Sequence, residues 1–513
     1  MTQTLGLDVG TQGTKGVVID SASGAIVARA SRSYDLIPGL APGAVEQDPR
    51  TWRGAVREVI AELLADRAVS AIAAVAISGQ QHGCVLLDEA DEPVRAAKLW
   101  CDTETANEAA ELGVPTGFTA SKILWTRRHE PELWARTRRV LLPHDYLNLV
   151  LTGVAAMESG DASGTGFFDV AMRTFDAAAV ARLDELSGDG SHLAERLPPL
   201  DVAWEREAGA TSGETQDRAQ LALEPIGRVT AAAAAEFGLA EGTLVARGGG
   251  DNMMSALGSG ATRAGIVVVS LGTSGTAFAH CDAPVVDPDG LIAPFCGSAG
   301  GWLPLLCVMN LTGVTEEVLA GASGAAELAG AESSALDHTA LTTAARAVPA
   351  GCDGLLWLPY LAGERVPDLP RATGTLLGMR AGHLQPGVLY RAALEGTSLN
   401  LAWGVERLRG LGVAAEEVRL VGGAANNPLW REVLAACLGA PVTVLEEPES
   451  GALGAALQAL ASVHRARGEV VDLHALAAPF VQLGASTQPD PELVATYAEL
   501  GARFREAVAE QHS

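Results

Sequence analysis

The sequence predicts an α/β fold of two similar domains that face each other across a cleft. The main observation is an internal repeat: Gly10-Thr-Gln-Gly-Thr14 and Gly272-Thr-Ser-Gly-Thr276 share their Gly and Thr positions, about half the chain apart. Each copy follows an apolar run, and in both halves apolar runs alternate with segments of helical spacing. We expect the domains to cover residues 1–245 and 246–513, each contributing one phosphate-binding loop to the cleft.

Composition indicates a globular protein that binds small molecules. The chain has 513 residues, of which 48% are hydrophobic and 19% are charged. A net charge of −26 argues against a nucleic-acid partner or an anionic membrane, because both attract basic surfaces. Seven scattered cysteines without a Cys-x-x-Cys pair indicate a reducing compartment and no zinc site. With no signal-like start and no apolar run of about 18 residues, we expect a cytoplasmic protein.

Residues 5–19 are typical of a strand, a glycine turn and a second strand. Asp8 ends the first strand, and the tip carries Thr11 and Gln12, followed by Lys15. Unpaired backbone N–H groups at such a tip can hold phosphate oxygens. The second copy offers the same chemistry at Gly272, Thr273 and Ser274.

The segment from Leu244 through three glycines to Asp251 predicts a buried strand that delivers a carboxylate to a crevice. Glycines there allow a sharp bend and the close approach of a ligand. The alternative is that Asp251 only caps a helix that starts at Asn252 or Met253.

A sugar-binding region is indicated by polar residues that follow a predicted strand over residues 69–77. Gln80, Gln81 and His82 combine amide and imidazole groups that suit the hydroxyls of a polyol, although a structural histidine is the alternative. Trp100 could stack on a sugar and Asp102 could accept from its hydroxyls. An interfacial tryptophan and a surface aspartate explain the same residues equally well.

The remaining elements follow the same α/β pattern. A strand over residues 418–421, the turn Gly422-Gly423 and a helix after Asn427 would let a base or ribose lie against the backbone, unless this is only a tight turn. The other expected elements are helices over 49–65, 386–408 and 495–510, helices within 314–348, a strand over 354–361, a closely packed small-residue helix start at 445–456, and a loop over 205–220.

Six motifs occur in an order that resembles the FGGY family of carbohydrate kinases, and within it the xylulose kinases. They are Asp-x-Gly-Thr from residue 8, Gly-Gln-x-His-Gly from 79, Gly-Gly-Gly-Asp-Asn from 248, Ser-Leu-Gly-Thr-Ser-Gly from 270, Leu-Pro-Tyr-Leu-x-Gly-Glu-Arg from 358 and Gly-Gly-Ala from 422. The resemblance covers nearly the whole chain. It implies two actin-like, ribonuclease-H-type domains and the ATP-dependent phosphorylation of a ketopentose, D-xylulose first, at its terminal hydroxyl.

The resemblance also implies a role for each motif. Asp251 is similar to the family's general base, and Asp8, with Asp251, is expected to hold Mg²⁺. The expected sugar contacts are Gln81, His82, Trp100, Asp102, Asp251 and Asn252. The expected ATP contacts are Thr11, Gln12, Lys15, Gly272, Thr273, Ser274, Gly422, Gly423 and Asn427.

One segment departs from the family pattern. The chain has Trp100-Cys-Asp-Thr-Glu104 where xylulose kinases commonly have Trp-Asn-Asp-x-Arg, and the segment before Phe118 is shorter than usual. A kinase for another pentulose, a pentitol or an aldonate therefore stays open, as does a non-catalytic sugar-binding regulator. A polymerising actin-like ATPase has no use for the motif at 79–83. The expected partners are the sugar and MgATP, and a homodimer is left open.

Overall fold

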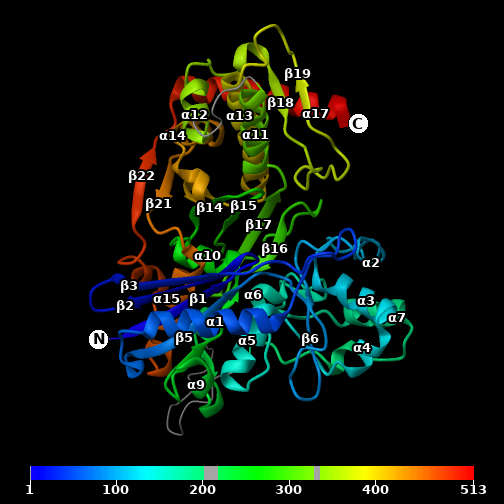
Figure 1. The fold of residues 1–513 in the computed structure, drawn as a ribbon, viewed down its shortest axis with the longest axis vertical. Helices are drawn as coiled ribbons and strands as arrows, with labels where there is room; N and C mark the ends of the chain where they lie inside the picture. The colour runs from blue at the N-terminus through cyan, green and yellow to red at the C-terminus, as the bar shows by residue number, and fades with distance from the viewer. Residues whose placement is uncertain (1, 202–217, 329–335, 513) are drawn as a thin grey trace.

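The computed structural model describes residues 2–201, 218–328 and 336–512. Two seven-stranded mixed sheets, each with its own helices, form two lobes that lie one above the other in Figure 1. This is the two-domain α/β architecture that the internal repeat predicted. Within the described ranges, no helix is long and apolar enough to cross a membrane.

The first sheet is built on the predicted N-terminal hairpin. β1 and β2 pair antiparallel, β3 continues the meander beyond β2, and β5 and then β12 run parallel to β1 on its other side. Apolar side chains of β1, β2 and β5 are buried, as expected for strands covered on both faces. The strands are β1 (Gln3–Val9), β2 (Gly13–Asp20), β3 (Ala25–Ser33), β5 (Ile72–Gly79), β11 (Pro225–Arg228), β12 (Leu244–Ala246) and β13 (Gly249–Gly250).

Helix α1 (Pro49–Leu64) covers this sheet and matches the helix predicted over 49–65. The strand predicted over 69–77 starts later, because Val69–Ala71 forms a 3₁₀ turn. A helical region inserted after β5 occupies the lower right of Figure 1. Its main elements are β6 (Val85–Leu87), β7 (Ala97–Lys98), α2 (Ala106–Leu112), α3 (Thr119–His129), α4 (Pro131–Arg136), β8 (Arg139–Leu141), α5 (Pro143–Thr152), α6 (Ser159–Ala162) and α7 (Ala177–Ser187).

The second sheet repeats the arrangement of the first. β14 and β15 form the antiparallel hairpin, β17 extends the meander, and β20 and β21 run parallel to β14. The sheet order is β16, β17, β15, β14, β20, β21, β22. The strands are β14 (Gly265–Leu271), β15 (Gly275–Ala279), β16 (Ala293–Cys296), β17 (Trp302–Val308), β20 (Ala415–Val421), β21 (Val442–Leu445) and β22 (Leu483–Thr487).

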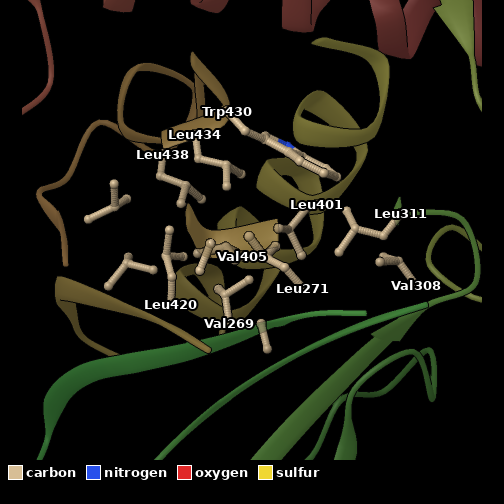
Figure 2. Close-up of a cluster of buried hydrophobic side chains, with 14 of the residues drawn as sticks. Val269, Leu271, Val308, Leu311, Leu401, Val405, Leu420, Trp430, Leu434 and Leu438 are labelled. Atoms are coloured by element: carbon tan, nitrogen blue, oxygen red, sulfur yellow. The ribbon is translucent and has the colours of Figure 1, made fainter. Parts of the chain in front are cut away.

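The core of the second lobe lies between this sheet and two helices. In Figure 2, Leu401 and Val405 of α13 and Trp430 of α14 face Val269 and Leu271 of β14. The predicted last helix also docks on this lobe, and it buries Leu500, Phe504 and Ala507 as expected. The helices are α11 (Thr312–Leu328), α12 (His338–Arg346), α13 (Pro386–Gly410), α14 (Pro428–Leu438) and α17 (Pro491–His512), beside the small sheet β18 (Leu356–Leu358) and β19 (Thr375–Leu377).

Two helices connect the lobes. α15 (Ser450–Ala466), from the second half of the chain, packs on β1 and β5 of the first sheet and against α10 (Asp251–Gly258). A Cβ at Gly258 would lie 1.9 Å from the carbonyl oxygen of Ser450, so the helices cross at backbone contact distance. This confirms the close packing that the small residues of 445–456 predicted.

The proposed boundary near residue 245 falls inside the first sheet, because β13 still pairs with β5. The loop predicted over 205–220 lies mostly outside the described residues. Its described end differs from the prediction, since Arg218–Ala222 forms the short helix α8.

Candidate active site

Three parallel strands of the first sheet end at one edge. Asp8 of β1 pairs with Ser78 of β5, and Gly250 of β13 pairs with Gly79. Carboxyl ends of parallel strands are where open α/β sheets place ligand contacts. Asp251 directly follows β13, so this register brings the two predicted acids to the same edge.

Asp251 is the first residue of α10, and Gly250 occupies the capping position. Asp251 Oδ1 accepts hydrogen bonds from the backbone and side-chain nitrogens of Asn252, at 2.8 and 2.9 Å. A capping aspartate normally accepts from the backbone N–H of the second or third helical residue after it, and Asp251 makes neither bond. The helix-cap alternative therefore loses its support.

Both acids are harder to ionise than usual. Burial, then the charges of Asp8 and Asp161, raise the pKa of Asp251 to about 7. Burial also raises the pKa of Asp8, although a 2.6 Å hydrogen bond from Ser78 Oγ and the charge of Lys15 oppose it. A carboxylate with a pKa near neutrality is well matched to accept a proton at physiological pH.

The first hairpin loop is fixed by side chains from other elements. Thr11 Oγ1 donates to Gln80 Oε1 at 3.0 Å and accepts from Trp100 Nε1 at 3.1 Å. Gln12 is exposed at the tip, and the ammonium of Lys15 lies 2.8 Å from Glu449, just before α15. Trp100 thus joins the phosphate loop to the predicted sugar region.

The carbonyl groups of the second hairpin loop accept hydrogen bonds from the protein's own backbone. The oxygens of Gly272 and Thr273 accept from the backbone at the start of α11, at 3.0 and 3.1 Å. Gly422 lies beside this loop with a φ of 95°, and a Cβ there would lie 2.6 Å from the oxygen of Leu271. Only glycine fits this turn, which leaves Gly422 and Gly423 exposed.

The side chain of Asn427 is already engaged. Its Oδ1 accepts from the backbone of Leu429 and Trp430, at 3.1 and 3.2 Å, and its Nδ2 donates to Thr342 at 2.9 Å. The tight-turn alternative therefore explains Asn427, which caps α14, without a nucleotide contact.

Asn252 connects the sugar motif to the second hairpin. Its Nδ2 donates to Gln81 Oε1 at 2.6 Å, and its Oδ1 accepts from Thr276 Oγ1 at 3.1 Å. The Gln81 amide nitrogen also contacts Met253 Sδ at 3.3 Å. The residue after the candidate base thus bridges the predicted sugar motif and the second copy of the repeat.

His82 and Asp102 are more buried than the sequence suggested. The His82 ring packs against Phe118 and Phe295, with centroids 5.1 and 5.5 Å away. Asp102 is 0% exposed, and its Oδ2 accepts from Val45 N at 2.9 Å and Lys98 Nζ at 3.2 Å. These contacts favour a structural role for Asp102, and its contact with the sugar stays a prediction.

The chain matches two family models, the FGGY family of carbohydrate kinases N-terminal domain over residues 3–206 and the C-terminal domain over residues 267–463. The chain belongs to the FGGY family of carbohydrate kinases. It is 36% identical to the xylulose kinase of Haemophilus influenzae, with 95% of each chain covered. It is 32% identical to that of Escherichia coli, over 98% and 97% of the two chains. A solved xylulose kinase from Rhodospirillum rubrum superposes with a TM-score of 0.84 at 28% identity, covering 99% of both chains.

In this FGGY kinase the acidic residues of the segment 100–104, which departs from the family pattern, are neutralised by a lysine. Glu46, Asp102 and Glu104 form an acidic cluster, and the ammonium of Lys98 contacts all three. Lys98 also lies 4.1 Å from the ring centre of Trp125. Lys98 fills the centre of the cluster, so we assign no metal there.

Several residues that support the site were not identified from the sequence. Ser78 donates to Asp8, and Gly451 lies against Asp8, where a Cβ would be 2.8 Å from the carboxylate carbon. Gln80, which the sequence suggested as a sugar contact, accepts a hydrogen bond from Thr11. Position offered a signal for Ser78, since it follows the predicted strand. The supports of His82, described below, carried no such signal.

Proposed function

We propose that the chain transfers the γ-phosphoryl group of ATP to the terminal hydroxyl of a ketopentose, D-xylulose first. The observation that carries the proposal is Asp251. It has a pKa of about 7 and lies at the sheet edge beside Asp8, and its neighbour Asn252 bonds to both the sugar motif and the second hairpin. The curated relatives, which are named xylulose kinases, support this choice of sugar.

In the proposed reaction Asp251 accepts the proton of the attacking hydroxyl. The proton leaves as the hydroxyl oxygen bonds to the γ-phosphorus and the bond to the β-phosphate oxygen breaks, releasing ADP. The side chains of Gln81, His82 and Asn252 orient the sugar, with Trp100 beside them. Because most of the catalysis in phosphoryl transfer is positioning and charge stabilisation, these contacts matter as much as the base.

Asp8 and Asp251 fit a divalent cation. Burial raises the pKa of both carboxyl groups, the charge of Asp8 raises that of Asp251 further, and Lys15, the cation that acts on Asp8, is half exposed and paired with Glu449. Mg²⁺ prefers carboxylate oxygens and retains much of its water, so we propose that Asp8 holds it through water, with Asp251 nearby. The metal would neutralise charge on the phosphates.

For the nucleotide we propose contacts from both hairpin loops and the glycine turn. Thr11, Gln12 and Lys15 face the phosphates from the first loop, and Gly272 to Ser274 do so from the second. Gly422 and Gly423 offer an exposed backbone for the base or ribose. Since the side chain of Asn427 is engaged, we limit its contribution to shaping this turn. Seven free cysteines and ATP as the donor support a cytoplasmic location.

The test is a coupled ADP-release assay with MgATP and a panel of D-xylulose, D-ribulose, L-ribulose, L-xylulose, ribitol, xylitol, glycerol and gluconate. We expect the strongest response with D-xylulose, and a kcat lower by roughly 10²- to 10⁴-fold in Asp251→Asn, with ATP binding retained. A stronger response to another polyol would move the specificity to the 100–104 segment. Sugar binding without ADP release would indicate a non-catalytic regulator.

A further inference from the structure

His82 has a backbone conformation that must be held in place. Its φ is 62°, in the left-handed region that residues other than glycine rarely adopt. Its carbonyl oxygen accepts from Lys122 Nζ at 2.6 Å and Thr119 Oγ1 at 3.2 Å. Its backbone nitrogen donates to Asp161 Oδ1 at 3.1 Å. Strained backbone that is fixed by several partners is typical of functional sites.

Lys122 links the backbone of His82 to that of Gly117, which lies against Trp100. The ammonium is completely buried, and it donates to the carbonyl oxygens of both His82 and Gly117, each at 2.6 Å. Gly117 lies against Trp100, where a Cβ would be 2.1 Å from the Trp100 oxygen. One buried cation therefore sets the backbone beneath two predicted sugar contacts.

Asp161 lies beside the imidazole ring of His82. The same Oδ1 that accepts the backbone N–H lies 3.3 Å from ring atom Nδ1, which is buried and is not aligned for a hydrogen bond in this structure, so the two groups interact electrostatically. Burial lowers the pKa of His82, so the ring carries one proton at neutral pH. Burial opposes ionisation of Asp161, but contacts from His144 and His82 hold its pKa at about 2. A permanent carboxylate beside Nδ1 favours the tautomer with the proton on Nδ1.

Burial first, and then the charges of Lys122 and Arg365, lower the pKa of His82 against the opposing effect of Asp161. His144 lies 2.9 Å from Asp145 and 3.3 Å from Asp161, and despite burial these acids raise the pKa of His144 well above the usual value. Nε2 of His82 makes no hydrogen bond within the described part of the chain, so it is free to accept one from a ligand.

We propose that Lys122 and Asp161 are positioning residues of the sugar site, which hold His82 with its proton on Nδ1 and present Nε2 as the acceptor for a sugar hydroxyl. The inference rests on the proposed function. Because Nε2 of His82 is then the hydrogen-bond acceptor, the sugar hydroxyl that contacts it must be the donor. A sugar analogue with a methoxy group in place of that hydroxyl loses this hydrogen bond.

The direct test is the protonation state of His82 in the wild-type protein. Nitrogen NMR of the ¹⁵N-histidine-labelled protein distinguishes the two tautomers and the imidazolium, and the signal is assigned by its absence from His82→Asn. We expect protonated Nδ1 and bare Nε2, with Nε2 shifting when D-xylulose is added. A proton on Nε2, or on both nitrogens, would overturn the proposal. Because the free protein is measured, this result does not depend on whether the proposed reaction occurs.

Kinetics test the role of Lys122. Lys122→Met should raise the KM for the sugar about tenfold or more, the effect expected when charged hydrogen bonds are lost, with the KM for ATP unchanged. Thr126→Val is the matched control, because Thr126 is buried on the same helix and donates only to the Lys122 carbonyl oxygen, at 2.8 Å. It should leave both KM values unchanged.

If Lys122→Met and Thr126→Val change the KM for the sugar equally, Lys122 has only a structural role and the proposal is wrong. If Lys122→Met does not fold, Thr119→Val, which removes the second hydrogen bond to the His82 oxygen, takes its place with a smaller increase expected. A wild-type protein that phosphorylates no sugar contradicts the proposed function instead.

Discussion

Replacing Asp251 by asparagine should make the protein more stable above pH 5 while it slows phosphoryl transfer. Asp251 ionises near 3.8 in an unfolded chain and near 7 in the folded protein. Between these values the unfolded state releases its proton and the folded state keeps it. The wild type therefore loses stability as the pH rises from about 4 to about 7, and the uncharged asparagine does not.

The magnitude follows from the same two pKa values. One pKa unit is worth about 1.4 kcal/mol, so the interval from 3.8 to about 7 is equivalent to about 4 kcal/mol at most. Asp251 is partly exposed, so solvent screens its charge and we expect about half of this, about 2 kcal/mol. The Asp251→Asn substitution also removes a favourable charge at the start of α10, which costs about 0.5 kcal/mol. Stabilisation is the larger effect.

The assay is thermal unfolding of both proteins from pH 5 to pH 8 without ligands. We expect the Tm of Asp251→Asn to exceed that of the wild type by about 2 °C at pH 8, with the difference shrinking toward pH 5. Asp66→Asn, which removes a carboxylate from an exposed position, should show no such trend. A Tm difference independent of pH, or a less stable Asp251→Asn at pH 8, would refute the raised pKa of the Asp251 carboxyl group.

Three further outcomes are expected. In the wild type, kcat/KM for the sugar should rise with pH and then level off below about 7, because the base must be unprotonated and bound Mg²⁺ would favour its ionised form; a flat profile would exclude Asp251 as the base. Gly451→Ala should lower kcat/KM at least tenfold by displacing the Asp8 carboxylate, whereas Gly321→Ala, with open space at its Cβ, should have no effect; equal activities would contradict the contact. Trp100→Phe, which removes the indole N–H that donates to the first loop, should raise the KM values for both ATP and sugar a few fold; an effect on the sugar alone would separate the two sites.

The sequence predicted the parts of the fold that depend on local pattern. The hairpins around Gly10 and Gly272 were recognised because apolar strands flank small, flexible residues, and the structure places both at equivalent positions of two similar sheets. Asp251 was placed at the end of a buried strand for the same reason. Its environment and the charge of Asp8 beside it follow from strand register, which the sequence pattern does not give.

The supports of the site depend on contacts between distant segments. Lys122 meets His82 across 40 residues, and Asp161 meets it across 79, with no local feature to indicate either pairing. Asp102 was expected in the sugar site because it lies near Trp100. The structure also places it in a buried ion pair with Lys98, a tertiary interaction that the sequence pattern did not indicate.

The most direct test of the proposed activity is phosphorus NMR of the product formed from D-xylulose and MgATP. The account predicts a new phosphate monoester, coupled to two protons of a terminal CH₂ group, that appears in step with ADP and only when both substrates are present. Release of inorganic phosphate alone, or no consumption of ATP with D-xylulose or any other sugar of the panel, would contradict it.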